Sequence, residues 1–65
     1  MISDNISNSA LKIAIAVEAK GKITRLLNEI KEESDPYSVA NKFEECARII
    51  RKMADTIGQI PNEDD

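Results

Sequence analysis

The sequence is short of the residues that most catalytic and metal sites use. Its 65 residues include no histidine, no tryptophan and a single cysteine. Without histidine or a second cysteine, the chain lacks the ligands of the usual zinc sites and a nucleophile activated by histidine. The sequence also contains no phosphate-binding loop and no other catalytic constellation. We therefore predict a protein that is not an enzyme and that needs no metal or cofactor.

Long apolar runs and targeting signals are missing as well. The longest apolar stretch is short and interrupted by charge, and no basic segment precedes an apolar core near Met1. These features predict that the chain has no membrane-spanning helix and no secretory signal. A single cysteine cannot form an intrachain disulfide, so we expect a reducing, cytoplasmic location.

The charge balance gives little attraction for nucleic acids. Nine Lys and Arg residues oppose twelve Asp and Glu residues, for a net charge of −3. Three of the acids are Glu63, Asp64 and Asp65, so the rest of the chain carries nine acids and nine bases. Many charges have i,i+4 spacing, which stabilises a helix by roughly a few tenths of a kcal/mol per pair. The predicted pairs are Glu18–Lys22, Arg25–Glu29, Glu44–Arg48 and Arg51–Asp55.

The two prolines and two glycines mark where helices begin and end. Any of residues 7–9 can cap a helix start, and Asp35 followed by Pro36 is typical of the start of a second helix. Gly58 suits the position after a helix, and Pro61 prevents its continuation. We predict a polar segment at 1–8, a helical hairpin at 9–58 with helices at 9–33 and 36–57, and an acidic disordered tail at 59–65.

Apolar residues recur at heptad spacing in both predicted helices, as in helices that pack side by side. The 36–57 helix carries Val39, Phe43, Cys46, Ile50, Met53 and Ile57, flanked by Ala40, Ala47 and Ala54. The 9–33 helix carries Ala16, Ala19, Ile23, Leu26 and Ile30, widened by Leu27. We therefore predict an all-α fold, an antiparallel hairpin in which the two seams face each other.

A hairpin of this size encloses little core. Small domains of this kind need a disulfide, a metal or an oligomer for stability. Because the sequence supports neither of the first two, we expect a homodimer in which two hairpins form a four-helix bundle.

The 9–33 helix has more apolar surface than a hairpin needs. Ile6, Ala10, Ile13 and Val17 form a second stripe, with Ala14 beside it. We interpret this stripe as the dimer interface or, alternatively, as a surface for a helix of another protein. A membrane contact is disfavoured, because the polar side of the helix is not strongly basic.

Lys20, Lys22 and Arg25 are the candidate nucleic-acid contacts. Lys20 and Lys22 project about 160° apart on a helix, whereas Lys22 and Arg25 project about 60° apart. Only the latter two share a face, so RNA binding is possible and not favoured.

The opening Ala10-Leu11-Lys12-Ile13-Ala14 and the later Leu27-Asn28-Glu29-Ile30 resemble the Rop (repressor of primer) family. The acidic bend, the heptad helix and the acidic tail after Gly58 add to this resemblance. It implies a hairpin that dimerises into an antiparallel four-helix bundle and binds RNA through the first helix of both subunits. The family presents an aromatic among polar and basic residues there, where this chain has Ala16 among apolar neighbours. We expect the architecture to carry over and the RNA function not to.

The chain is also similar in size and hairpin pattern to the small co-chaperones of type III secretion, which clamp a partner helix. The function predicted from the sequence is thus a small interaction module or regulator that acts through packing of helix faces. A Rop-like RNA-binding regulator and a secretion-type co-chaperone are the alternatives.

Overall fold

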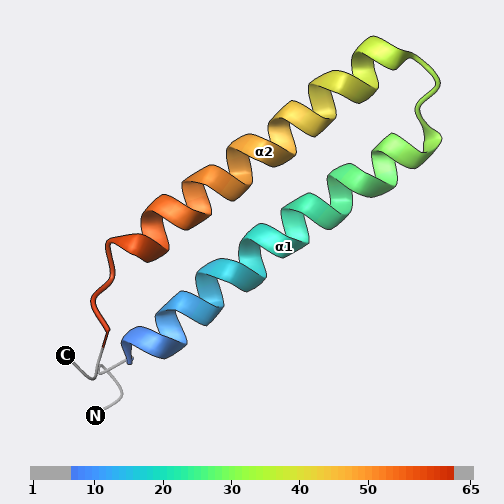
Figure 1. Cartoon of the computed structure of the whole chain (residues 1–65). Helices are drawn as coiled ribbons and strands as arrows, with labels where there is room; N and C mark the ends of the chain where they lie inside the picture. The colour runs from blue at the N-terminus through green and yellow to red at the C-terminus, as the bar shows by residue number, and fades with distance from the viewer. Residues whose placement is uncertain (1–6, 63–65) are drawn as a thin grey trace.

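A computed structural model of the chain describes residues 7–62. Two helices, α1 (Asn8–Glu32) and α2 (Pro36–Gly58), lie side by side and run in opposite directions (Figure 1). No strand occurs between residues 7 and 62. The prediction of an all-α, two-helix hairpin is confirmed.

The helix starts follow the capping residues of the sequence. The Ser7 hydroxyl accepts a hydrogen bond from the Ala10 N–H at 3.0 Å, so α1 begins at Asn8, one residue before the predicted start. The Asp35 carboxylate accepts from the Ser38 N–H at 3.2 Å, and Pro36 occupies the first helical position of α2. Proline costs nothing there because its missing N–H would have no partner in the helix.

The bend between the helices is held by Glu33. Its carboxylate accepts a hydrogen bond from the Asp35 N–H at 3.2 Å and lies 4.0 Å from the Lys42 ammonium group. Glu33 also caps the C-terminus of α1, because its N–H donates to the Ile30 carbonyl at 3.1 Å. One side chain thus connects the end of α1 to the second turn of α2.

The end of α2 differs from the expected glycine stop. Gly58 is still helical, and no described residue has a positive φ angle. Residues 59 and 60 continue with 3₁₀-type hydrogen bonds, from Gln59 N–H to Thr56 and from Ile60 N–H to Ile57. The predicted end of this helix at residue 57, with Gly58 after it, therefore falls one residue short of the observed end.

The segment after α2 returns to the start of α1. Asn8 donates through Nδ2 to the Pro61 carbonyl at 3.1 Å, and Lys12 donates through Nζ to Asn62 Oδ1 at 2.7 Å. Ile60 is partly buried. Residues 59–62, expected to be part of a disordered tail, are thus in contact with α1, and residues 63–65 lie outside the described part.

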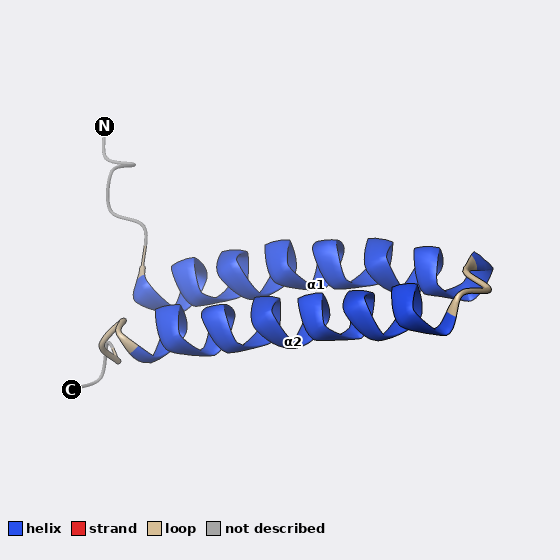
Figure 2. Cartoon of the chain, turned by 90° about the horizontal axis from the view of Figure 1, so that it is seen from above, coloured by secondary structure: helices blue, strands red, loops and turns tan. Residues whose placement is uncertain are grey.

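The hairpin is a single layer of two helices (Figure 2). Its extents are 50 × 22 × 13 Å. Among residues 7–62, only Ala19 and Cys46 are buried, each with 7% of its surface exposed. Folded domains normally consist of at least two packed layers around a core. Residues 7–62 do not supply the second layer that would cover the apolar side chains.

Candidate functional site

The contact between the helices follows the predicted seam in α1. Ala16, Ile23, Leu26 and Ile30 are partly buried along the side that faces α2, together with the buried Ala19. The predicted seam of this helix therefore lies where the heptad pattern placed it, except for Leu27, which is 44% exposed.

The seam of α2 differs from the prediction in two positions. Val39, Cys46, Met53 and Ile57 are buried or partly buried, as expected. Phe43 and Ile50, predicted as seam residues, are 51% and 47% exposed. Lys42 and Ile49 take the inner positions one residue earlier and are partly buried. The prediction that Phe43 and Ile50 face α1 was wrong, because Ile49 satisfies the same spacing and the two neighbours cannot both point inward.

These positions divide the flat hairpin into two broad faces. On one, a shallow depression of about 250 Å³ lies over the line between the helices. We call this the groove face. Its lining residues are Ile15, Glu18, Ala19, Lys22, Ile49, Lys52, Met53 and Thr56. It combines an apolar floor with three charged side chains, two lysines and one glutamate.

The other face carries the exposed residues of the α2 heptad. At about 100° per residue, Phe43 and Ile50 project on the opposite side of the Cys46–Met53 line from Ile49. By the same geometry, Ala16 and Leu27 project on the opposite side of α1 from Ile15. We call this surface the Phe43 face. Its residues are Ile13, Ala16, Lys20, Leu27, Phe43, Ala47, Ile50 and Ala54.

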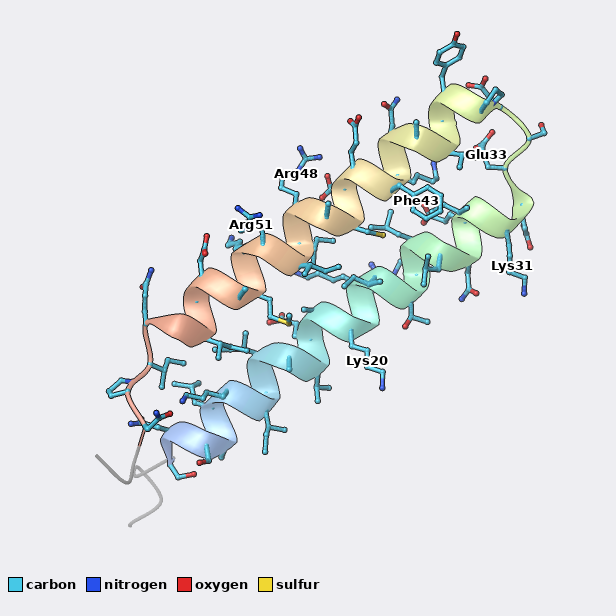
Figure 3. All side chains as sticks on the ribbon, viewed as in Figure 1. Lys20, Lys31, Glu33, Phe43, Arg48 and Arg51 are labelled. Carbon is cyan, nitrogen blue, oxygen red and sulfur yellow. The ribbon has the colours of Figure 1, made fainter. Side chains whose placement is uncertain are left out.

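The Phe43 face is broad and predominantly apolar. Phe43 lies over the gap between the two helices (Figure 3). Leu27 beside it is 44% exposed, and Ile13 at the other end is 63% exposed. Lys20 is the charged residue nearest the middle, and it projects from the rim of α1 away from α2 (Figure 3). An apolar surface of this extent is unusual on an isolated chain and typical of an interaction site.

The predicted apolar stripe lies on the outer side of α1. Ala10, Ala14 and Val17 are exposed on the side turned away from α2, and Ile13 lies between this side and the Phe43 face. Ile6, the first residue of the predicted stripe, lies outside the described residues. The structure thus leaves the stripe uncovered and places a second apolar surface next to it.

Sequence reasoning missed the Phe43 face as a site. It identified Phe43, Ile50 and Leu27 as apolar seam residues and assigned them to the hairpin interior. The adjacent pair Ile49-Ile50 could have indicated this face. Two consecutive residues of a helix point in different directions, so one of the two isoleucines must lie outside the contact with α1.

The predicted basic contacts do not form one patch. Lys22 lines the groove face, whereas Lys20 projects from the opposite rim. Arg25 is exposed on the side of α1 nearer Lys22. Lys22 is accompanied in the groove by Glu18, which offsets its charge. The arrangement therefore offers a nucleic-acid backbone no continuous basic surface through these three residues.

One predicted ion pair has a different partner. Arg48 forms its salt bridge with Glu45, three residues earlier, instead of with Glu44. Arg48 and Arg51 both project from the side of α2 away from α1 (Figure 3).

Residues 7–62 contain neither a cluster of metal-binding side chains nor a helix suited to span a membrane. No group of three or more Cys, Asp or Glu side chains there is placed to hold a metal ion. Neither described helix combines the length and the apolar character that crossing a bilayer requires. Comparison of the chain with protein-family models, with curated proteins and with solved structures found no match.

Proposed function

We propose that the protein is a non-enzymatic interaction module or small regulator of the cytoplasm, which acts by packing an apolar helix face onto another helical surface. The observation that carries this proposal is the exposure of large apolar side chains on a one-layer hairpin. Phe43, Ile50, Ile13 and Val17 are each about half exposed or more. Burying a fully exposed side chain of this size contributes roughly 1.5–3 kcal/mol, so covering the exposed part of several of them favours association.

Two surfaces serve this function. The Phe43 face extends over both helices, and the stripe formed by Ala10, Ile13, Ala14 and Val17 extends along the outer side of α1. A dimer of hairpins that forms a four-helix bundle supplies the missing second layer for one of them. The resemblance to the Rop family supports the same architecture. The remaining surface is available to a helix of another protein.

Sedimentation equilibrium over a hundred-fold concentration range tests the proposal. We expect a dimer at micromolar concentration and a thermal midpoint that rises with protein concentration, because association stabilises the folded chain. A cooperatively folded monomer whose thermal midpoint does not depend on protein concentration contradicts the proposal. The hairpin would then be stable with its apolar face exposed to solvent.

A further inference from the structure

We infer that a second copy of this chain covers the Phe43 face, with the bends of the two hairpins at opposite ends of the bundle. This inference rests on the proposed function and specifies its partner, its surface and its register. Three observations support it: the area of the hairpin side that carries the face, the distribution of large and small side chains along the face, and the charges at its edge.

The broad side of the hairpin that carries the Phe43 face has about the area that a stable dimer buries. A helix of 25 residues such as α1 is about 37 Å long, and two helices side by side are about 20 Å wide. The broad side of the hairpin that carries the face therefore measures roughly 750 Å², and a standard protein–protein interface buries about 800 Å² of each partner. A second hairpin matches this surface over its whole length, whereas a single partner helix covers only part of its width.

Large and small side chains are distributed unevenly along the face. Leu27 and Phe43 lie in the half nearest the bend, and Ala16 and Ala54 lie in the half nearest the chain ends. If both bends were at the same end, large residues would meet large ones and alanines would meet alanines. With the bends at opposite ends, the half that carries Leu27 and Phe43 lies over the half that carries Ala16 and Ala54, which favours interlocking layers.

This arrangement places α2 antiparallel to α2 of the second copy around a two-fold axis. An axis midway between Ala47 and Ile50 sets Phe43 level with Ala54 of the second copy. It also sets Ile50 level with Ala47 of the second copy. Both pairs occur twice by symmetry, so four large side chains are each opposite an alanine.

The charges at the edge of α2 complement each other in this register. Arg51 and Glu44 are exposed beside the Phe43 face. In the antiparallel register, Arg51 lies about two residues, or about 3 Å along the axis, from the level of Glu44 of the second copy. Long side chains span such an offset, so two intermolecular ion pairs form. Lys20 has the heptad position of Ile13 and Leu27, so its stem covers part of the face and its ammonium group extends past the rim into solvent.

Disulfide cross-linking tests the surface and the register together. In a Cys46→Ala background, Ala47→Cys lies beside the proposed axis, within about 4.5 Å of its symmetry mate along the helix direction. We expect it to form a covalent dimer under mild oxidation. Ala54→Cys lies on the same face about 16 Å from its mate, and Ala14→Cys lies on the outer side of α1, so both controls stay monomeric on a non-reducing gel.

The controls separate the possible failures. A chain that sediments as a dimer but cross-links through Ala14→Cys and not through Ala47→Cys overturns the Phe43 face as the interface and leaves the proposed function intact. A dimer that cross-links through neither position overturns the register. A folded monomer overturns the proposed function itself. Circular dichroism of each variant before oxidation shows that the helices are retained.

Charge reversal gives an independent measurement of the same register. Arg51→Glu should raise the dimer dissociation constant about 2- to 10-fold, and adding Glu44→Arg in the same chain should restore it. Reversal of Arg48, which pairs with Glu45 within its own chain, is the matched control and should leave the constant unchanged. Loss of affinity without rescue by Glu44→Arg contradicts the antiparallel register.

Discussion

Ile49 and Ile50 are neighbours in the sequence and belong to opposite faces of the hairpin. Ile49 is partly buried beside Ala19 and Met53 in the groove between the helices. Ile50 is 47% exposed on the Phe43 face. One residue thus holds α1 and α2 together, and the next is available to a second molecule.

This division predicts different effects for the two isoleucines. Ile49→Ala should lower the free energy of unfolding by about 1–2 kcal/mol, because a half-buried side chain loses its contact with α1. Ile50→Asp should raise the dimer dissociation constant at least about 10-fold, because it places a charge in the interface. Denaturant unfolding and sedimentation equilibrium measure the two effects. Equal effects of both variants on association would show that the faces are not separate.

The outer stripe of α1 should behave differently from the Phe43 face. Val17→Asp with Ala14→Asp should leave the dimer dissociation constant within about two-fold of its original value. These side chains point away from α2 and from the second copy on the Phe43 face. Sedimentation equilibrium of the double variant beside Ile50→Asp makes the comparison. If the stripe variant dissociates and Ile50→Asp does not, the stripe is the dimer interface that the sequence first indicated.

The cap of α2 should contribute measurably to stability. Asp35→Ala removes the carboxylate that accepts from the Ser38 N–H and should cost about 1 kcal/mol. Ser34→Ala, one residue earlier and outside both helices, is the control and should have little effect. The midpoint of urea unfolding at fixed protein concentration reports both changes.

Gly21 should be replaceable with a gain in stability. It lies in the interior of α1, its φ angle is not positive, and a Cβ there meets no atom within 4 Å. Gly21→Ala should therefore raise the free energy of unfolding by about 0.5–1 kcal/mol. Ala19→Leu, two residues earlier in the buried seam, should lower it by about 1–3 kcal/mol through overpacking. Unchanged stability in both variants would contradict the described orientation of α1.

The thiol of Cys46 can report whether the two helices separate in solution. Cys46 is 7% exposed between the helices. Its reaction with a thiol reagent should be slow in the native protein and fast in denaturant, because reaction requires access to the sulfur. A native rate equal to the denatured rate would show that the hairpin seam is open in solution.

The sequence predicted the helices well because their signals are local. Ser7 and Asp35 act through hydrogen bonds to residues three positions away, and Pro36 acts through its own backbone. The heptad spacing of α1 also identified the side that faces α2.

Which apolar residues remain uncovered could not be predicted in the same way. The α2 pattern allows either Ile49 or Ile50 inside, and the choice depends on the rotation of α2 against α1. Local spacing does not determine that rotation, because it is set by the packing of side chains from both helices. Because of this ambiguity the sequence did not predict the Phe43 face, although its apolar residues were all recognised as apolar.

The contacts of Asn8 with Pro61 and of Lys12 with Asn62 have an engineering consequence. They bring the two ends of the described chain together at one end of the hairpin, opposite the bend. A short linker can therefore join residue 62 to residue 7, and new termini can be opened within residues 33–35. Such a circular permutant reverses the order of α1 and α2 along the chain and keeps every side chain of both faces in place.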